Sequence, residues 1–183
     1  VGKITRTLRL GYLFPVILIF TIFNSFTSRH FFKKKMGLFE KGRMVCLQWL
    51  GTQVKKGAVV RKGLFITDFG KLKLGENTTL GPFARLFLFE QFTIGDNVEI
   101  GSGLTVHTSE HLLNEVDKPL GKQSSLRAPV SIASDVYIGS NVTILSGAQI
   151  ESRVVVGACS LVKGRLESGY LYAGVRAKKI KAL

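Results

Sequence analysis

Residues 132–163 read IASDVY IGSNVT ILSGAQ IESRVV VGACSL VK, with isoleucine or valine at every sixth position. The same step occurs upstream in IGDNVE IGSGLT V, over residues 94–106. A period of six matches neither the 3.6-residue repeat of an amphipathic helix nor the two-residue repeat of a half-buried strand. It is typical of a parallel β-helix, in which each hexad forms one short strand and one corner. The aliphatic positions are Ile94, Ile100, Val106, Ile132, Ile138, Ile144, Ile150, Val156 and Val162.

The hexads also predict which side chains lie inside the coil and which lie at its corners. Three hexads close one triangular coil of roughly eighteen residues, and the first residue of each points inward onto its counterpart in the next coil. The fifth residue sits at a corner and is small or aliphatic, as in Val98 and Ala148. Glycine directly after the aliphatic residue, as in Gly95 and Gly139, permits a positive φ or a close approach of backbone.

The extent of the hexads divides the chain into three parts. They predict a β-helix over residues 63–167, after an N-terminal segment of residues 1–62 and before a C-terminal tail of residues 168–183. Weaker hexads begin at Leu74 and Leu80, but the step from Leu80 to Ile94 is not a multiple of six. One corner in that interval is therefore expected to carry about two extra residues.

The positive charge of the chain is concentrated in its N-terminal third. Residues 1–65 hold thirteen lysines and arginines against one acidic residue, Glu40, whereas the whole chain has a formal net charge of +14. The rest of the chain is close to neutral, so the basic character does not belong to the β-helix. A basic excess favours a negatively charged partner, and no recognised nucleic-acid-binding motif accompanies it. We therefore expect no nucleic acid among the partners.

The same N-terminal segment contains an apolar run, LGYLFPVILIFTIFNSF, over residues 10–26. The run is short for a membrane-spanning helix, which needs about 20 apolar residues, and Pro15, Asn24 and Ser25 weaken a span further. With basic residues on both sides, residues 1–35 are expected to form a helical segment that lies on an anionic membrane surface. The alternative is a helix packed on the coil or on a neighbouring subunit.

The largest interruption of the hexads separates Val106 from Ile132. This stretch contains Pro119 and Pro129 and is expected to leave the coil as a protruding loop over residues 112–129. Long loops in repeat folds commonly carry function. His107 follows an inward position and is expected to point outward, while His111 stands at the root of the loop. An imidazole at that place is able to accept a proton from a hydroxyl group near neutral pH.

The hexads, the loop after His111 and the tail YAGVRAKKI (172–180) together resemble the hexapeptide-repeat acyltransferases. Within that family the similarity, over about residues 66–181, is to sugar and polysaccharide O-acetyltransferases such as the galactoside and maltose acetyltransferases. The resemblance implies a left-handed parallel β-helix with an N-terminal helical segment. It further implies a homotrimer with active sites between subunits, and transfer of an acetyl group from acetyl-CoA to a sugar hydroxyl without a covalent enzyme intermediate.

The resemblance assigns His111 as the general base, because the catalytic histidine of galactoside acetyltransferases follows an IGDN turn at the spacing of Ile94 to His111. Glu90, Glu99 and His107 are candidates for binding the acceptor, and Glu90, Glu99 or Glu110 for orienting His111. A backbone N–H at a coil corner is expected to stabilise the oxyanion. The residues that the resemblance assigns to acetyl-CoA are Tyr137, Ser140, Ala158, Lys163, Gly164, Lys178 and Lys181.

Some family positions are altered in this chain, and they affect the expected acceptor. Arg176 stands where the family's tail has proline, and Gly81 and Phe89 stand where the galactoside enzymes have an asparagine and an aspartate that hold a small sugar. A surface polysaccharide or a lipid-linked glycan is therefore the expected acceptor, with the enzyme in the cytoplasm, peripheral on the inner face of the cytoplasmic membrane.

Other functions remain as alternatives at this stage. One alternative is an acetyltransferase whose acceptor is a small free sugar, serine or drug. Another is a non-catalytic β-helix used for assembly. A carbonic anhydrase on the same fold needs three histidines around zinc, and only His107 and His111 fall in the coil region, so no metal is expected.

Overall fold

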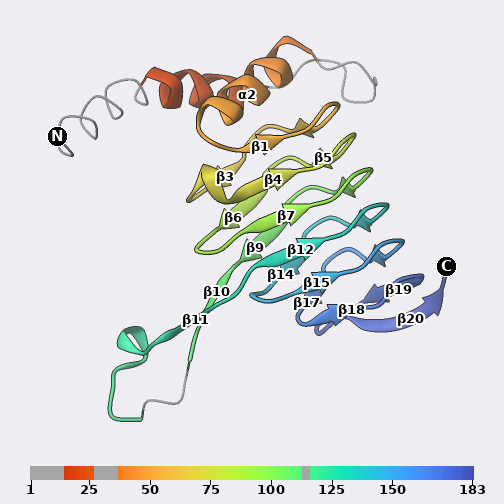
Figure 1. The fold of residues 1–183 in the computed structure, drawn as a ribbon. Coiled ribbons are helices and arrows are strands. Elements are labelled where there is room, and N and C mark those ends of the chain that lie inside the picture. The colour runs from red at the N-terminus through yellow and green to blue at the C-terminus, as the bar shows by residue number, and fades with distance from the viewer. Residues whose placement is uncertain (1–14, 27–36, 113–115) are drawn as a thin grey trace.

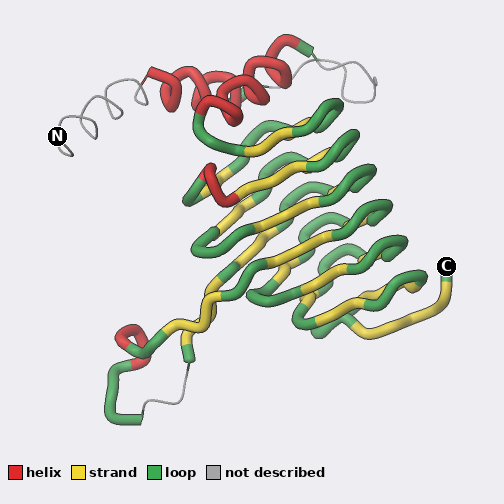
Figure 2. Tube along the Cα trace, in the orientation of Figure 1, coloured by secondary structure: helices red, strands yellow, loops and turns green. Residues whose placement is uncertain are grey.

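The computed structural model describes residues 15–26, 37–112 and 116–183. Three sheets of parallel strands wind around a common axis into a triangular prism of six coils, with helices at its N-terminal end (Figure 1). The predicted left-handed parallel β-helix is confirmed. Figure 2 shows that the strands alternate with short turns, as the hexads predict.

Each of the first five coils contributes one strand to each of the three sheets. Sheet A contains β1 (Gln53–Val54), β4 (Leu72–Leu74), β7 (Phe92–Ile94), β12 (Val130–Ile132), β15 (Gln149–Ile150) and β18 (Arg165–Leu166). Sheet B contains β2 (Val59–Val60), β5 (Thr79–Leu80), β8 (Glu99–Ile100), β13 (Tyr137–Ile138), β16 (Val155–Val156), β19 (Tyr170–Ala173) and β20 (Lys178–Ala182). Sheet C contains β3 (Phe65–Ile66), β6 (Arg85–Phe87), β9 (Thr105–His107), β14 (Thr143–Ile144) and β17 (Leu161–Val162).

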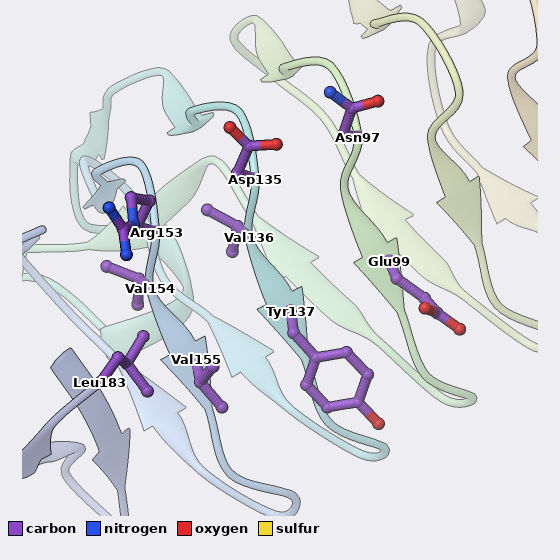
Figure 3. A pocket seen from close by; sticks show the side chains of 9 residues that line it. All are labelled: Asn97, Glu99, Asp135, Val136, Tyr137, Arg153, Val154, Val155 and Leu183. Atoms are coloured by element: carbon purple, nitrogen blue, oxygen red, sulfur yellow. The ribbon is translucent and has the colours of Figure 1, made fainter. Parts of the chain in front are cut away.

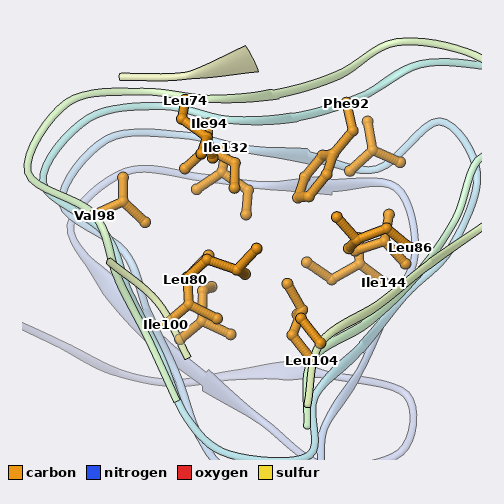
Figure 4. Packing of buried hydrophobic residues seen from close by; sticks show 14 of the residues in the cluster. Leu74, Leu80, Leu86, Phe92, Ile94, Val98, Ile100, Leu104, Ile132 and Ile144 are labelled. Carbon is orange, nitrogen blue, oxygen red and sulfur yellow. The ribbon is translucent and has the colours of Figure 1, made fainter. Parts of the chain in front are cut away.

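The core is a set of aliphatic ladders along the axis of the prism. In sheet A the register pairs Ile132 with Ile94 on one side and with Ile150 on the other, so identical side chains stack from coil to coil. Figure 4 shows these ladders pointing into the interior together with Leu80, Leu86 and other members of the cluster. The first residues of the hexads from Ile94 onward are all buried, and so are the fifth residues at the corners, except Glu110 at the start of the interruption.

The glycines directly after the inward residue are needed for close approach between coils, since none of them has a positive φ. A Cβ atom on Gly101 would lie 2.7 Å from the backbone nitrogen of Ser140 in the next coil, closer than real Cβ contacts allow. The positive φ instead occurs at the fourth position of the hexad, for example at Asn97 (φ 56°) and Asn141 (φ 57°). Asparagine tolerates this left-handed conformation better than most residues, which is why it recurs there.

The corner between sheet C and sheet A absorbs the variation in coil length. Two extra residues lie between Ile66 and Leu74, where η1 (Phe69–Lys71) forms, and again between Leu86 and Ile94. The second of these is the enlarged corner that the sequence predicts. The long interruption leaves the prism at the same corner of the third coil. The other two corners keep the plain step of six, so the ladders stay in register.

The β-helix begins before residue 63, the expected boundary. The first coil is formed by β1, β2 and β3, whose inward residues Val54, Val60 and Ile66 follow the six-residue step. Basic corners between these residues obscure the step in the sequence. At the other end β19 lies in the sixth coil, and β20 returns antiparallel to β19. The C-terminal tail is therefore part of sheet B.

Two helices close the N-terminal end of the prism. Residues 15–25 are helical, and α2 (Leu38–Trp49) follows; both lie across the first coil (Figure 1). Phe20 packs edge-on against Phe69 with ring centroids 5.5 Å apart. The Asn24 side chain donates to the Leu64 carbonyl at 2.9 Å and accepts from the Leu64 N–H at 3.0 Å. One face of the apolar segment thus packs on the coil, which is the alternative that the sequence left open.

A buried arginine ties these helices to the first coil. Arg43 has no exposed surface and donates to the Val60 carbonyl at 2.6 Å and to the carbonyls of Phe23 and Phe26 at 2.6 and 2.7 Å. The carbonyls at a helix end lack partners within the helix, so a guanidinium satisfies them well. Burial lowers the pKa of Arg43, and Glu40 acts in the opposite direction.

Within residues 15–26, 37–112 and 116–183, no helix has both the length and the apolar content that crossing a bilayer requires. The expected membrane role of residues 1–14 and 27–36 lies outside the described residues, as does His30.

Replacing Ile138 with aspartate is expected to destabilise the coil stack by at least about 3 kcal/mol, because a carboxylate inside the prism has no partner. Tyr137→Asp is the matched control, since the neighbouring side chain is exposed on the outer face of the same strand. Thermal unfolding followed by circular dichroism measures both. Equal stability of the two variants would contradict the inward assignment of Ile138.

Candidate active site

The interruption after Val106 forms an antiparallel hairpin that projects from the prism (Figures 1 and 2). β10 (Ser109–His111) pairs with β11 (Ser125–Arg127), and η2 (Leu120–Lys122) lies near the far end. The predicted protruding loop over residues 112–129 thus starts from a pair of strands that begins at Ser109, and pairing of the two ends satisfies their backbone polar groups. Residues 113–115 lie outside the described part.

A buried threonine fixes the base of the hairpin. The Thr108 hydroxyl oxygen accepts hydrogen bonds from the backbone N–H groups of Phe89 and Glu90, at 2.7 and 2.9 Å. Its backbone carbonyl accepts from the N–H of Ala128 at 3.1 Å, where the chain returns. The guanidinium of Arg127 also lies over the Phe89 ring, 5.2 Å from its centroid. The enlarged corner of the second coil thus holds the hairpin of the third.

His111 is the last residue of β10 and is exposed to solvent. It stands opposite Ser125 in the hairpin register. Because successive residues of a strand point to opposite faces, Glu110 points away from the side that His111 occupies. The Glu110 carboxylate instead forms an ion pair with the Lys163 ammonium at 2.8 Å, which joins the hairpin to the end of β17. The second carboxylate oxygen of Glu110, Oε1, is buried without a hydrogen-bond partner.

His107 points outward, as predicted, on the outer face of sheet C. Its ring stacks on Phe87 of the preceding coil, with centroids 4.7 Å apart and planes within 2° of parallel. Burial lowers the pKa of His107 below its ordinary value, Arg85 adds to this effect, and Glu110 opposes it. The imidazole is therefore held neutral at neutral pH, with one nitrogen able to donate and the other to accept.

The three acidic candidates for orienting His111 lie in different places. Glu110 is engaged by Lys163, and Glu99 lies on the outer face of sheet B, on another side of the prism. Glu90 remains on the hairpin side, half-buried, with its backbone nitrogen bonded to Thr108. Of the three, Glu90 alone shares the hairpin corner with His111 without being held in a described ion pair.

Two of the residues assigned to acetyl-CoA lie together at the corner between sheets B and C. The backbone carbonyl of Ser140 accepts from the N–H of Cys159, next to Ala158, at 2.8 Å. The Ser140 hydroxyl lies 3.2 Å from that of Ser102 one coil earlier. Small side chains thus line this corner over three coils. Ser102 was missed by sequence reasoning, although it occupies the same place after Ile100 as Ser140 does after Ile138.

The remaining assigned residues are spread over other parts of the prism. Lys163 and Gly164 lie at the corner between sheets C and A, where Gly164 adopts a φ of +78°. Lys178 and Lys181 are exposed on β20, opposite Ala173 and Leu171 of β19. The single chain therefore does not gather all the assigned residues in one place.

Tyr137 and Glu99 meet in a shallow groove of about 410 Å³ on the outer face of sheet B (Figure 3). The two side chains are opposite one another in neighbouring strands. Asp135 and Arg153 lie at one end of the groove, and the C-terminal Leu183 borders it. His111 is not part of this groove.

No group of three or more histidine, cysteine, aspartate or glutamate side chains in the described ranges is arranged to hold a metal ion. Thr108, Phe87 and Arg127, which position the hairpin and His107, were not found from the sequence. Their roles arise from contacts between coils, and the six-residue pattern contains no signal for them.

Comparison with known proteins shows which families and structures this chain is similar to. The family model of the bacterial transferase hexapeptide (six repeats) matches residues 129–164. WbbJ of Escherichia coli, assigned to lipopolysaccharide biosynthesis as an O-acetyl transferase, is 30% identical over 65% of this chain and 65% of its own. The hexapeptide-repeat acetyltransferase VCA0836 of Vibrio cholerae superimposes with a TM-score of 0.75 at 23% identity, covering 95% of this chain and 92% of that chain. The structure of galactoside acetyltransferase in complex with coenzyme A superimposes with a TM-score of 0.71 at 21% identity, covering 92% of this chain and 79% of that chain.

These matches confirm the resemblance to hexapeptide-repeat acyltransferases that the hexads indicate. The match to the hexapeptide family model covers residues 129–164, and the chain spans 37% to 65% of the length of the first two curated relatives it matches. VCA0836 has also been solved in complex with acetyl coenzyme A.

The lowered pKa of His107 predicts a pH-dependent stability. Its contribution is fully present above the ordinary value of 6.5 and decreases as the pH falls below it, because the unfolded chain then binds the proton more readily. His107→Phe keeps a ring on Phe87 and is expected to lose this part of the pH dependence. Urea unfolding of both proteins between about pH 7.5 and pH 5.5 measures the difference. Identical pH profiles would contradict the assignment.

Proposed function

We propose that the chain is an acyl-CoA-dependent O-acetyltransferase that moves an acetyl group from acetyl-CoA to a hydroxyl group of a sugar. The observation that carries the proposal is the placement of His111: solvent-exposed, on a strand anchored by Thr108, at the root of a hairpin on a hexapeptide β-helix. The relatives named above act as O-acetyl or acetyl transferases, and two of them bind coenzyme A or its acetyl form.

The chemistry follows from an imidazole next to a hydroxyl group. A neutral His111 accepts the proton of the sugar hydroxyl while its oxygen attacks the thioester carbonyl carbon. The tetrahedral intermediate collapses with cleavage of the carbon–sulfur bond, and the imidazolium returns the proton to the thiolate of CoA. A backbone N–H of a coil corner stabilises the oxyanion. No covalent bond to the protein is needed.

The donor is proposed to lie along the small-residue corner between sheets B and C. Ser140 and Ala158 leave room there for the pantetheine arm, and Lys178 and Lys181 are exposed for the phosphates. The resemblance assigns Lys163 to acetyl-CoA, but we propose another role for it, because its ammonium is already paired with Glu110. Lys163 is thus proposed to position the hairpin, and Tyr137 to border the donor side of sheet B.

A homotrimer with sites between subunits is part of the proposal. His111 lies beyond the end of β9, whereas Ser140 and Ala158 lie at the corner before β14 and β17, so the width of sheet C separates them within one chain. A neighbouring copy would bring its small-residue corner to the hairpin of the first and complete the site.

The proposed acceptor is a surface polysaccharide or lipid-linked glycan. Gly81 and Phe89 replace the asparagine and aspartate with which the galactoside enzymes hold a small sugar, and the Phe89 ring is covered by Arg127. His107 and Glu90, on the hairpin side, remain available as polar contacts. Because acetyl-CoA is supplied in the cytoplasm, the reaction is proposed to take place there.

Small acceptors such as a free sugar, serine or a drug form the alternative within the same chemistry. A panel of radiolabelled acetyl transfer assays with polymeric, lipid-linked and free saccharides distinguishes them. Faster acetylation of free monosaccharides than of the larger glycans would contradict the proposed acceptor.

His111→Ala is expected to lower kcat by roughly 10²–10⁴-fold, because the general base is lost, while acetyl-CoA still binds. Steady-state kinetics and calorimetric titration of coenzyme A measure the two effects. The control is Lys55→Gln, which changes an exposed side chain outside the proposed site and keeps both histidines. An unchanged kcat in His111→Ala would remove His111 as the base and leave a non-catalytic assembly role open.

The Glu110–Lys163 ion pair is expected to act through the position of His111. Lys163→Gln is predicted to reduce kcat about tenfold with little change in the KM for acetyl-CoA, and the charge-swapped double variant Glu110→Lys/Lys163→Glu to restore part of it. Lys55→Gln, which breaks a comparable surface pair with Asp96 in another part of the prism, is the matched control. A rise in KM alone would instead indicate direct contact of Lys163 with the donor.

A further inference from the structure

The outward face of α2 is apolar although it packs against nothing in the described structure. The buried residues of α2 are Glu40, Arg43, Met44, Cys46 and Leu47, and four of them recur at helical spacing on the side of the first coil. Leu38, Val45 and Trp49 are spaced by seven and four residues and therefore share the opposite face. Their exposed fractions are 75%, 52% and 76%.

The helix of residues 15–25 has the same division of its surface. Phe20 is buried against the coil, whereas Ile17, Leu18 and Ile22 are exposed. Phe26, just after this helix, is exposed as well. Isolated apolar side chains on a surface are ordinary, but several on two adjacent helices form a patch that marks a site of interaction. We call the exposed large apolar residues of this N-terminal part the helical face: Ile17, Leu18, Ile19, Ile22, Phe26, Leu38, Val45 and Trp49.

The sequence of the N-terminal third, to which the helical face belongs, is strongly basic. Residues 1–65 contain thirteen basic side chains and one acidic side chain, and that acid, Glu40, is only 1% exposed. Lys41 is exposed on α2, at helical spacing from Leu38 and Val45, and Lys56 is exposed in the first coil, whereas Lys55 is paired with Asp96. An apolar surface bordered by lysines, with no exposed acid from this part of the chain, is complementary to an anionic lipid surface.

We propose that the helical face binds an anionic bilayer, with the apolar side chains inserted among the lipids and the lysines at the headgroups. A second copy of the chain is a poorer occupant, because a twofold contact would bring two equally basic surfaces together. Tryptophan at such a boundary is favoured, since its ring is apolar and its N–H remains at the polar side. The inference goes beyond the proposed acetyl transfer, and its test does not use catalysis.

In the orientation that follows, the N-terminal end of the prism lies at the bilayer and the rest of the prism extends away from it. The helices cover one end of the prism and β20 lies at the other (Figure 1). The hairpin that carries His111 leaves the third coil, two coil spacings or about 10 Å from the first. From there the hairpin runs away from the helices (Figure 1), so, if the proposed function holds, an acceptor anchored in the same bilayer has to extend outward from the surface to reach His111.

Trp49 allows a direct test, because it is the single tryptophan of the chain. The full-length protein is mixed with vesicles of phosphatidylcholine alone or with added phosphatidylglycerol, and tryptophan emission and co-sedimentation are recorded. We expect a shift of emission to shorter wavelength, and quenching by bromine-labelled lipid, with the anionic vesicles only. Both effects are expected to weaken as salt is raised.

The double variant Leu38→Glu/Val45→Glu keeps Trp49 and is expected to bind anionic vesicles at least about tenfold more weakly. Val175→Glu is the control, since Val175 is equally apolar and exposed but lies in the C-terminal segment at the other end of the prism. Point variants are preferred to deletion of the first helix, which would remove Asn24 from Leu64 and uncover Arg43.

Three outcomes would overturn the proposal. Vesicle binding without a change in Trp49 emission would place the contact elsewhere on the chain. Emission that shifts with protein concentration but not with lipid would show that a second copy covers the helical face. Equal loss of vesicle binding in Val175→Glu would show that the net charge of the protein, and not the helical face, determines binding.

Discussion

The structure depends on the burial of one inward side chain in every hexad against the same position in the next coil. The aliphatic ladders have no other partner, so a coil is stable only when coils stand above and below it. Because coils stack at the spacing of neighbouring strands, some corner positions have no room for a side chain. This explains why residue 101, next to Ser140 of the following coil, is glycine. Every functional residue is therefore positioned on a rigid scaffold with a fixed repeat distance.

Because two corners must keep the step of six, insertions concentrate at the third. The corner between sheets C and A carries the two-residue extensions of the first and second coils and the hairpin of the third. The extension of the second coil is used directly: its Phe89 and Glu90 backbone groups bind Thr108 and so support the hairpin. Tolerance to insertion and the location of the candidate base thus have one physical origin.

The ends of the stack face a different problem, because a terminal coil exposes its ladder. At the N-terminal end the helices cover it, with Arg43 satisfying the carbonyls of the first helix and of β2. At the C-terminal end β20 pairs with β19 and returns along sheet B. The N-terminal cap has a second, outward surface that the coil does not need, and this is the surface to which we assign the membrane.

The six-residue period alone determined the β-helix, the inward ladder from Ile94 to Val162 and the point at which a segment leaves the coil, because burial of one residue in six is a local, repeated requirement. The sequence pattern did not predict the first coil, because basic side chains fill the corners between Val54, Val60 and Ile66. Only the tertiary structure decided that Thr108 anchors the hairpin, that Lys163 pairs with Glu110 and that the apolar N-terminal segment has one face on the coil and one in solvent. These contacts join residues from different coils, and their distances depend on how insertions at one corner are folded, which no local pattern records.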